Sequence, residues 1–318
     1  MSKARELAEL GAVYDSGALS NRNLIINGDF SISQRGDYSS ATAISTAKYY
    51  LDRWKTDISG VSATIEHDAV DLPNGITTKS AKIAASSSAS GYMQLTQPIE
   101  TQSFMDNRKV TISAYVRSNN ANTKIRVEGA VSGNFDGTAH TGGGGWELLK
   151  ETITVIDSVS AFRAGVIMWN SGAISISSGD FFEIAHFQVE FGTEATPFEQ
   201  RSFGDELARC ERYFQVYADT DYTPVAVGIT LTATQARVFL NYRAPMRAPA
   251  SIDGFSNLIH TDRASYNLAV SSLSRTYGST NGMVIDVTSS SGATASRVAM
   301  LTADVNNSPN YFHVDAEL

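Results

Sequence analysis

Side chains that could carry out catalysis are present in this sequence, but not at the spacings that common catalytic or metal sites require. The five histidines are His67, His140, His186, His260 and His313. None lies three or four residues from another, so a metalloprotease-like pair on one helix is excluded. The single cysteine, Cys210, excludes a cysteine-rich structural zinc site and an intrachain disulfide. We therefore expect no metal centre.

Enzyme motifs are also missing. The sequence has no Gly-x-Ser-x-Gly elbow, no P-loop and no dinucleotide fingerprint that follows a strand. The glycines at 142–145 lie between two expected strands and indicate a turn. A glycosidase needs two carboxylates about 5–10 Å apart, a separation that sequence does not reveal. Asp205 and Glu206 suit a helix N-terminus better than a catalytic pair. We expect no catalytic residue, no cofactor and no enzymatic activity.

Aromatic side chains offer a better functional signal, because sugar rings stack on exposed aromatic faces and nearby polar groups fix their orientation. The three tryptophans are Trp54, Trp146 and Trp169. In the stretch from Val110 to Arg117, alternate residues are apolar, which places Tyr115 and Arg117 on the opposite face. Trp169 lies on the polar face of another expected strand. If these faces form one concave sheet, Tyr115, Arg117 and Trp169 line a glycan-binding groove. The alternative is that each tryptophan is a partly buried or rim aromatic.

Composition limits the possible partners and the fold class. The net charge is −8 and the isoelectric point is near 5.2, so nucleic acid is not an expected partner. Charged residues make up only 18% of the chain, and Ser, Thr, Gly and Asn are abundant, as in proteins built of strands and turns. No stretch of 18 or more residues is continuously apolar, and no signal peptide is evident, so we expect a soluble protein without membrane insertion.

Alternating segments separated by polar turns predict an all-β protein. The expected strands are 24–26, 110–117, 124–131, 146–156, 162–169, 181–191, 225–229, 236–242, 266–270, 283–287, 297–302 and 311–318. An apolar stripe at spacings of four, three and four predicts one helix near 204–214, with Cys210 as a small buried side chain on it. The pattern of Ser2–Leu10 predicts a second helix, in which Leu7 and Leu10 share a face.

These elements divide the chain into four expected segments. Residues 1–22 form an N-terminal helix and linker, and residues 23–201 form a β-sandwich. Residues 202–214 form a short helix between the domains, and residues 215–318 form a smaller C-terminal β domain. A nine-residue helix is too short to be stable alone, so the N-terminal segment needs a partner or frays.

Several segments resemble bacteriophage tail fibre and virion structural proteins, many of them from marine phages. They read NLIINGDFSISQRG at 23–36, YLDRW at 50–54, FQVEFGTEATPFEQR at 187–201, GDELARCERYF at 204–214 and APMRAP at 244–249. The first is also similar to the first strand of jelly-roll carbohydrate-binding modules. These segments occur in order and span the whole chain.

The resemblance implies a jelly-roll sandwich similar to carbohydrate-binding modules, followed by a C-terminal β-sandwich or knob. It also implies a tail fibre or spike protein, made in the cytoplasm of a bacterial host, that helps to recognise a host surface glycan. The protein would form a homotrimer and attach to other tail proteins through its N-terminal segment. Two alternatives remain: a purely architectural virion protein (adaptor, nozzle or head decoration), and a polysaccharide-degrading tailspike.

One departure from the jelly-roll pattern concerns calcium. Modules of this type often bind a structural calcium through an aspartate early in the last strand, where this chain has Ala185 and His186. Imidazole is a poor calcium ligand, because calcium prefers oxygen. Asn27 and Asp29 remain possible ligands, but we expect no metal.

Overall fold

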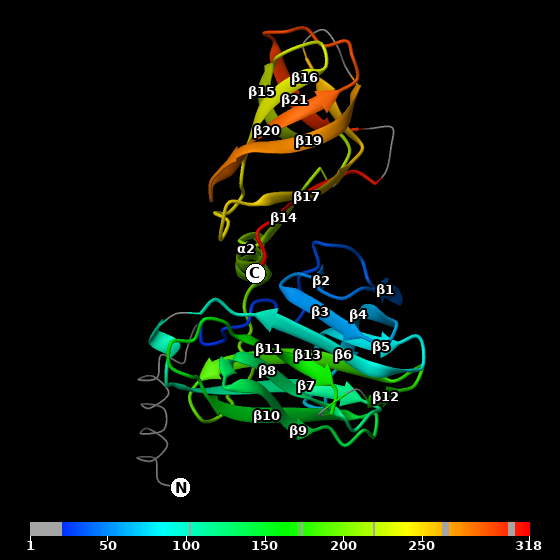
Figure 1. Ribbon diagram of the computed structural model, residues 1–318, viewed down its shortest axis with the longest axis vertical. Helices are drawn as coiled ribbons and strands as arrows, with labels where there is room; N and C mark the ends of the chain where they lie inside the picture. Colours follow the sequence, from blue (N-terminus) through cyan, green and yellow to red (C-terminus); the bar gives the residue numbers. More distant parts are fainter. Residues whose placement is uncertain are drawn as a thin grey trace. The chain divides into compact units, whose positions relative to one another are not determined.

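The structure is a computed structural model that describes residues 21–101, 103–170, 172, 174–218, 220–262, 267–304 and 309–318. The helix expected at Ser2–Leu10 lies outside these residues. The chain divides into two compact units, Met1–Glu206 and Leu207–Leu318, so the boundary falls within the predicted inter-domain segment at 202–214. Figure 1 labels most of the strands of both units. Among the described residues, no helix has both the length and the apolar character needed to cross a membrane.

The first unit is a β-sandwich of two antiparallel sheets (Figure 1). Its elements are β1 (Thr42–Ile44), β2 (Lys48–Leu51), β3 (Trp54–Ser59), β4 (Ala63–Asp71), β5 (Thr77–Ala85), β6 (Ala89–Pro98), the 3₁₀ turn η1 (Ser103–Met105), β7 (Lys109–Ser118), β8 (Thr123–Val131), β9 (Gly133–Ala139), β10 (Trp146–Thr154), β11 (Arg163–Met168), β12 (Ile174–Ile176) and β13 (Phe181–Phe191). One sheet has the order β1-β4-β5-β13-β7-β10. The other has the order β2-β3-β6-β11-β8-β9, and β12 pairs with β6. The β-sandwich architecture predicted for this region is confirmed.

The core lies between these two sheets, and strand β7 shows how the sequence pattern produces it. Val110, Ile112, Ala114 and Val116 are fully buried, as their alternation predicts, because successive side chains of a strand point to opposite faces. Trp54 is also fully buried, more deeply than the partly buried or rim position considered for it. Its ring meets that of Phe187 edge-on at 5.3 Å. Burial of these aromatic and branched side chains supplies most of the drive to fold.

The segment before the first strand does not form the strand expected at 24–26. Its backbone is irregular, although the Leu24 amide donates to the carbonyl of Val189 at 2.8 Å. In the Asn27-Gly28 pair, the residue with a positive φ is Asn27, at 59°. Gly28 is required for a different reason: a Cβ there would lie 2.2 Å from the carbonyl oxygen of Phe187. The glycine therefore permits the close approach of two backbones.

The second unit contains a small three-stranded sheet and a closed barrel. Its elements are most of helix α2 (Phe203–Glu211) and the strands β14 (Phe214–Tyr217), β15 (Pro224–Thr230), β16 (Gln235–Asn241), β17 (Ser251–Ser256), β18 (Leu258–Thr261), β19 (Leu268–Gly278), β20 (Gly282–Ser289), β21 (Val298–Ala303) and β22 (Tyr311–Asp315). The sheet has the order β14-β22-β17, and the barrel closes as β15-β16-β20-β19-β18-β21. The predicted C-terminal β domain is thus confirmed, and its strands close into a barrel instead of forming a second sandwich.

Helix α2 begins one residue before its predicted start and ends three residues earlier than predicted. Ser202 precedes it, and its hydroxyl accepts the Asp205 amide at 3.2 Å, as an N-cap does. Cys210 is fully buried, as expected, but Phe203 is 63% exposed. The predicted apolar stripe therefore does not continue to the first residue of the helix.

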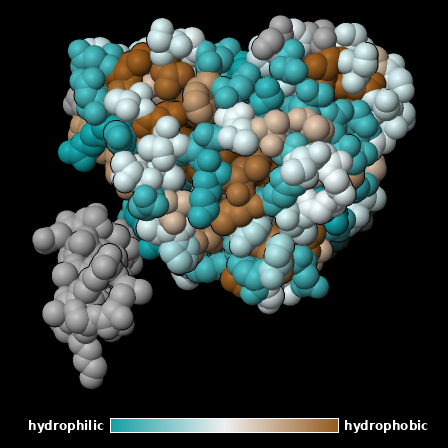
Figure 2. All heavy atoms as spheres, turned by 90° about the horizontal axis from the view of Figure 1, so that it is seen from below, coloured by the Kyte–Doolittle hydropathy of each residue, from teal (hydrophilic) through white to brown (hydrophobic). Residues whose placement is uncertain are grey.

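Some large apolar side chains remain on the surface. Figure 2 shows one face of the molecule, on which apolar residues gather in separate patches between hydrophilic ones. On the barrel, three such side chains form a row across neighbouring strands. Met300 of β21 lies opposite Val227 of β15, and Val227 lies opposite Phe239 of β16. All three side chains are exposed. Exposed apolar rows of this kind mark candidate contact surfaces.

Candidate functional site

The outer face of the six-stranded sheet carries a row of charged and aromatic side chains across five strands. The register pairs Glu66 of β4 with Lys82 of β5, and Lys82 with Glu183 of β13. It continues from Glu183 to Arg117 of β7, and from Arg117 to Trp146 of β10. Cross-strand neighbours of this kind lie about 5 Å apart, within reach of one another's side chains.

Contacts within the row hold these groups in place. Lys82 Nζ lies 2.7 Å from Glu66 Oε2. Arg117 donates to the buried carboxylate of Glu183, which also accepts the Ser80 hydroxyl at 2.6 Å. The Arg117 guanidinium lies 5.3 Å from the Trp146 ring centroid, a cation–π distance. The partly exposed indole of Trp146 is therefore oriented by an arginine that is itself anchored.

A polar cavity of about 390 Å³ lies over this row. Besides the row itself, Asp68, Asp71 and Ser80 line it. Carboxylates accept hydrogen bonds and cations donate them, so the cavity offers both functions beside an aromatic face. A polyhydroxylated ring requires this combination, since each hydroxyl both donates and accepts.

A second cavity of about 370 Å³ uses the next outward-facing row of the same sheet. Tyr115 lies two residues from Arg117 on β7, and Leu148 lies two residues from Trp146 on β10, opposite Tyr115. Two residues of a strand span about 7 Å, so the two cavities occupy neighbouring parts of one face. Ile76, Pro197 and Phe198 also line the second cavity, and its walls are mainly apolar.

A bulge in β13 brings His186 into this second cavity. The pairing of β13 with β7 shifts register between Ala185 and Gln188, and His186 has a φ of 49°. Its ring stacks on Phe198 at 4.3 Å with planes 7° apart. The Tyr115 ring lies 6.5 Å away, edge-on. Bulges re-aim a side chain in this way, and they are frequent near functional sites.

The His186 ring carries an unsatisfied polar atom. The residue is only 4% exposed, and its Nε2 is buried with no hydrogen-bond partner among the described residues. Burial lowers the pKa of His186, and the charge of Asp29 opposes this effect only in part. The imidazole is therefore neutral near pH 7 and presents one unpaired nitrogen. Few buried polar groups lack a partner, so such an atom at a cavity requires an explanation.

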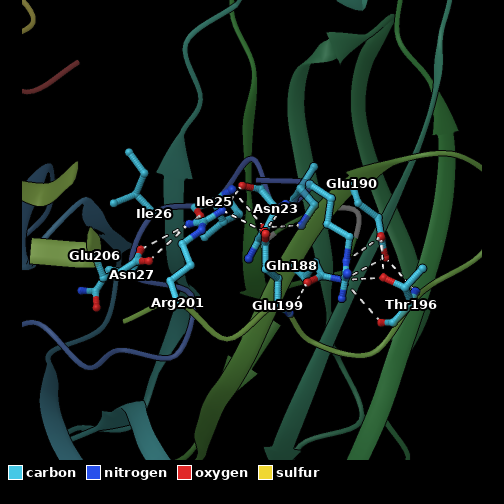
Figure 3. Close-up of polar contacts among 12 residues, drawn as sticks. Asn23, Ile25, Ile26, Asn27, Gln188, Glu190, Thr196, Glu199, Arg201 and Glu206 are labelled. Carbon is cyan, nitrogen blue, oxygen red and sulfur yellow. Dashed lines mark hydrogen bonds and ion pairs between the residues drawn. The ribbon is translucent and has the colours of Figure 1, made fainter. Parts of the chain in front are cut away.

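The wall formed by Phe198 is held by buried polar side chains of β13, shown in Figure 3. The Thr196 amide and hydroxyl donate to the two oxygens of Glu190, at 2.8 and 2.6 Å. The Glu199 amide donates to Gln188 Oε1 at 2.8 Å. Residues on both sides of Phe198 are thus anchored to the strand that carries His186. The segment at 187–201 therefore builds one wall of the cavity.

Arg201 joins this segment to the start of the sandwich (Figure 3). Its guanidinium donates to the carbonyls of Asn23 and, at 2.9 Å, Ile25. It also pairs with Glu199 at 3.1 Å and with Glu206 at 3.3 Å. The two carboxylates differ in pKa. Burial raises that of Glu206, whereas for Glu199 the Asn23 amide and Arg201 outweigh burial and lower it.

The structure separates the three residues that the sequence analysis placed in one groove. Tyr115 lines the apolar cavity and Arg117 the polar one. Trp169 follows β11 in the other sheet, where Arg126 lies 5.2 Å from its ring. The expectation of one concave sheet containing all three is wrong, because β7 and β11 lie on opposite sides of the core.

Sequence reasoning did not assign Trp146, Glu183, His186 or Phe198 to the site. Trp146 is one of the three tryptophans named above but is not among the predicted groove residues, and its position opposite Arg117 depends on the pairing of β10 with β7. The position of His186 depends on the bulge. The feature of the sequence that could have located the site is the segment at 187–201. It contains Phe198 and is one of the segments quoted for their resemblance to phage proteins.

Comparison with known proteins gives only distant similarities. No family model and no curated protein matches the sequence. Among solved structures, the enzymatically active domain of tailspike protein 4 from bacteriophage CBA120 matches with a TM-score of 0.37 at 13% identity. That match covers 54% of this chain and 22% of the tailspike chain.

Carbohydrate-binding modules give similar scores. TmCBM61, solved with β-1,4-galactotriose, matches with a TM-score of 0.32 at 15% identity, over 54% of this chain and 100% of its own. The xylan-binding domain CBM22-1 of Paenibacillus barcinonensis Xyn10C has a TM-score of 0.32 at 14% identity, over 50% and 99% of the two chains. The protein thus has distant structural similarity to a phage tailspike domain and to carbohydrate-binding modules.

Proposed function

We propose that the outer face of the six-stranded sheet binds a glycan on the surface of a bacterial host, and that the protein does so as part of a phage tail fibre or spike. The observation that carries the proposal is the pair of adjoining cavities, one polar beside Trp146 and one apolar beside Tyr115 and His186. Sugars present both hydroxyls and apolar ring faces, so they match a surface that alternates between the two.

The proposed role is binding without cleavage. In the polar cavity, Glu183 is committed to Arg117 and Ser80, and Glu66 to Lys82. These contacts commit both carboxylates to neighbouring side chains, whereas a glycosidase needs two carboxyl groups that reach the glycosidic bond. The phage role is supported by the segments quoted above, which resemble tail fibre proteins over the whole chain.

We expect the Arg117→Ala and Trp146→Ala variants to lose host-cell affinity by about tenfold or more, since truncating an anchor in an aromatic site costs about 1.4–2 kcal/mol. Trp169→Ala is the matched control, because it removes a tryptophan from the opposite sheet. Binding of the purified protein to intact bacterial cells is measured with and without enzymatic stripping of surface polysaccharide.

The results separate the candidate functions. Saturable binding that is lost on stripping, and weakened by the first two variants alone, supports the proposal. Weakening by Trp169→Ala alone would place the site on the other sheet. No binding to hosts of the parent phage would favour the architectural alternative. Shortened polysaccharide after incubation with the protein would favour the tailspike enzyme.

Assembly into a homotrimer is part of the same proposal, and the apolar row on the barrel supports it. The row next to it holds the exposed pair of Arg237 and Asp286, whose guanidinium and carboxylate lie 2.7 Å apart. In a threefold assembly each copy contacts two neighbours, and an apolar row placed near the axis meets the same row of both. Attachment to other tail proteins through residues 1–22 is also proposed, and that segment lies outside the described residues.

We expect the purified protein to have the mass of three chains by light scattering, and the Phe239→Lys variant to shift toward the mass of one. A lysine at the centre of an apolar contact must be desolvated, which weakens association. Tyr222→Lys is the control, because Tyr222 is exposed but lies outside the row. An unchanged mass for Phe239→Lys would show that this row is not the contact.

A further inference from the structure

We propose that the apolar cavity around His186 accepts a sugar unit that carries an acetamido group. This inference rests on the proposed function, because it names the class of glycan that the outer face of the six-stranded sheet selects. The cavity has a volume of about 370 Å³, within the range of small-molecule sites, and one sugar ring with a substituent fits such a space.

The two cavities on this face differ in chemistry. Four carboxylates line the polar cavity, together with Lys82 and Arg117. No carboxylate lines the other, whose walls include Ile76, Tyr115, Leu148, Pro197 and Phe198. A sugar with hydroxyls at every position would lose hydrogen bonds with water against such walls, at a cost for each unpaired group. A methyl group removed from water there would instead be stabilised.

The unpaired His186 nitrogen determines which apolar substituent fits. A neutral imidazole nitrogen forms one hydrogen bond, as donor or acceptor according to its tautomer. An acetamido group has an N–H, a carbonyl oxygen and a methyl group within a few atoms of each other. It can therefore place its methyl against the apolar wall and satisfy Nε2 once a turn of the ring brings that buried atom to the cavity surface. A plain hydroxyl would satisfy the nitrogen and leave the wall uncovered.

Other polar groups at the cavity are consistent with this substituent. Ser113 and Lys150 line it beside Tyr115 and Leu148, and Lys150 is exposed at the rim. A lysine ammonium donates to a carbonyl oxygen. It would also attract a carboxylate, so an acidic sugar is the competing ligand that the experiment must include.

The test uses matched trisaccharides and isothermal titration calorimetry at pH 7.5. Chitotriose and cellotriose share one β-1,4-linked backbone and differ only in the acetamido or hydroxyl group at carbon 2. A pair with the galacto configuration and a galacturonate trimer complete the set. We expect the acetamido member of at least one pair to bind tenfold or more tightly than its hydroxyl partner. Equal binding within both pairs, tighter binding of galacturonate, or no binding to any of them would overturn the inference.

Two variants assign the preference to this cavity. His186→Phe keeps an aromatic ring to stack on Phe198 and removes the nitrogen, and Leu148→Gln makes an exposed wall residue polar with little risk to folding. Each is expected to reduce the acetamido preference at least threefold. Ile156→Gln, at an exposed apolar residue outside the cavity, is the matched control. A preference that both variants leave unchanged would place the selection elsewhere.

The same measurements distinguish the two proposals. Host-cell binding that is lost on stripping, without an acetamido preference, would leave the proposed function standing and remove this inference. Absence of both cell binding and trisaccharide binding would remove both.

Discussion

The Arg201→Ala variant is expected to lower the free energy of unfolding of the sandwich by about 3–5 kcal/mol, the usual effect of removing one partner from a buried ion pair. Arg201 is the cation between Glu199 and Glu206, and its guanidinium also satisfies the carbonyls of Asn23 and Ile25. Alanine would leave two mostly buried carboxylates without their cation and two carbonyls without this donor.

Tryptophan fluorescence during urea denaturation measures this effect on the sandwich alone, because Trp54, Trp146 and Trp169 all belong to the first unit. Arg163→Ala is the matched control. It makes the same change of charge in the same unit, but Arg163 is 46% exposed and lies 3.6 Å from Glu128. Exposed ion pairs contribute about 0–1 kcal/mol to stability, so the control should hardly change the free energy of unfolding. Similar losses for both variants would contradict a special role for Arg201.

The second large effect is expected for Asn27→Ala, which should lower the free energy of unfolding by about 3–5 kcal/mol. Its amide group donates to the carbonyls of Ile32 and Asp52, at 2.8 and 3.1 Å, and accepts the Ile32 amide at 2.9 Å. The side chain is fully buried, so alanine would leave these backbone groups without partners, at about 1–3 kcal/mol each. The backbone of Asn27 also accepts the indole N–H of Trp54 at 2.9 Å and donates to Glu206.

The control separates hydrogen bonding from backbone strain. Asn107 has the same φ as Asn27, 59°, but it is exposed, and its amide donates to Asp157 at 3.4 Å. Asn107→Ala therefore reports mainly the cost of placing alanine at positive φ, which we expect to be about 1 kcal/mol. If both substitutions cost the same, the buried hydrogen bonds of Asn27 would contribute little.

These effects give a structural role to two of the segments quoted from the sequence. Asn27 and Arg201 lie in the segments at 23–36 and 187–201. In the structure they join the beginning of the sandwich to its end, 174 positions apart along the chain. Arg201 also pairs with Glu199, the residue after Phe198, which stacks on His186. A loss of stability here should therefore also disturb the apolar cavity.

The sequence by itself determined the fold class, eleven of the 22 described strands and the outward direction of Tyr115 and Arg117. These follow from alternation, because the period of two in a strand is local and survives whatever the strand pairs with. Helix α2 was also predictable from local signals, although Phe203 proved to be exposed.

Only the tertiary structure decided which strands are neighbours, and the site depends on that. Trp146 meets Arg117 because β10 pairs with β7, and Trp169 is removed from them because β11 belongs to the other sheet. His186 enters the cavity because β13 has a bulge, at which its pairing with β7 shifts register between Ala185 and Gln188. Pairing and bulges arise from contacts between residues far apart in sequence, so no local pattern encodes them.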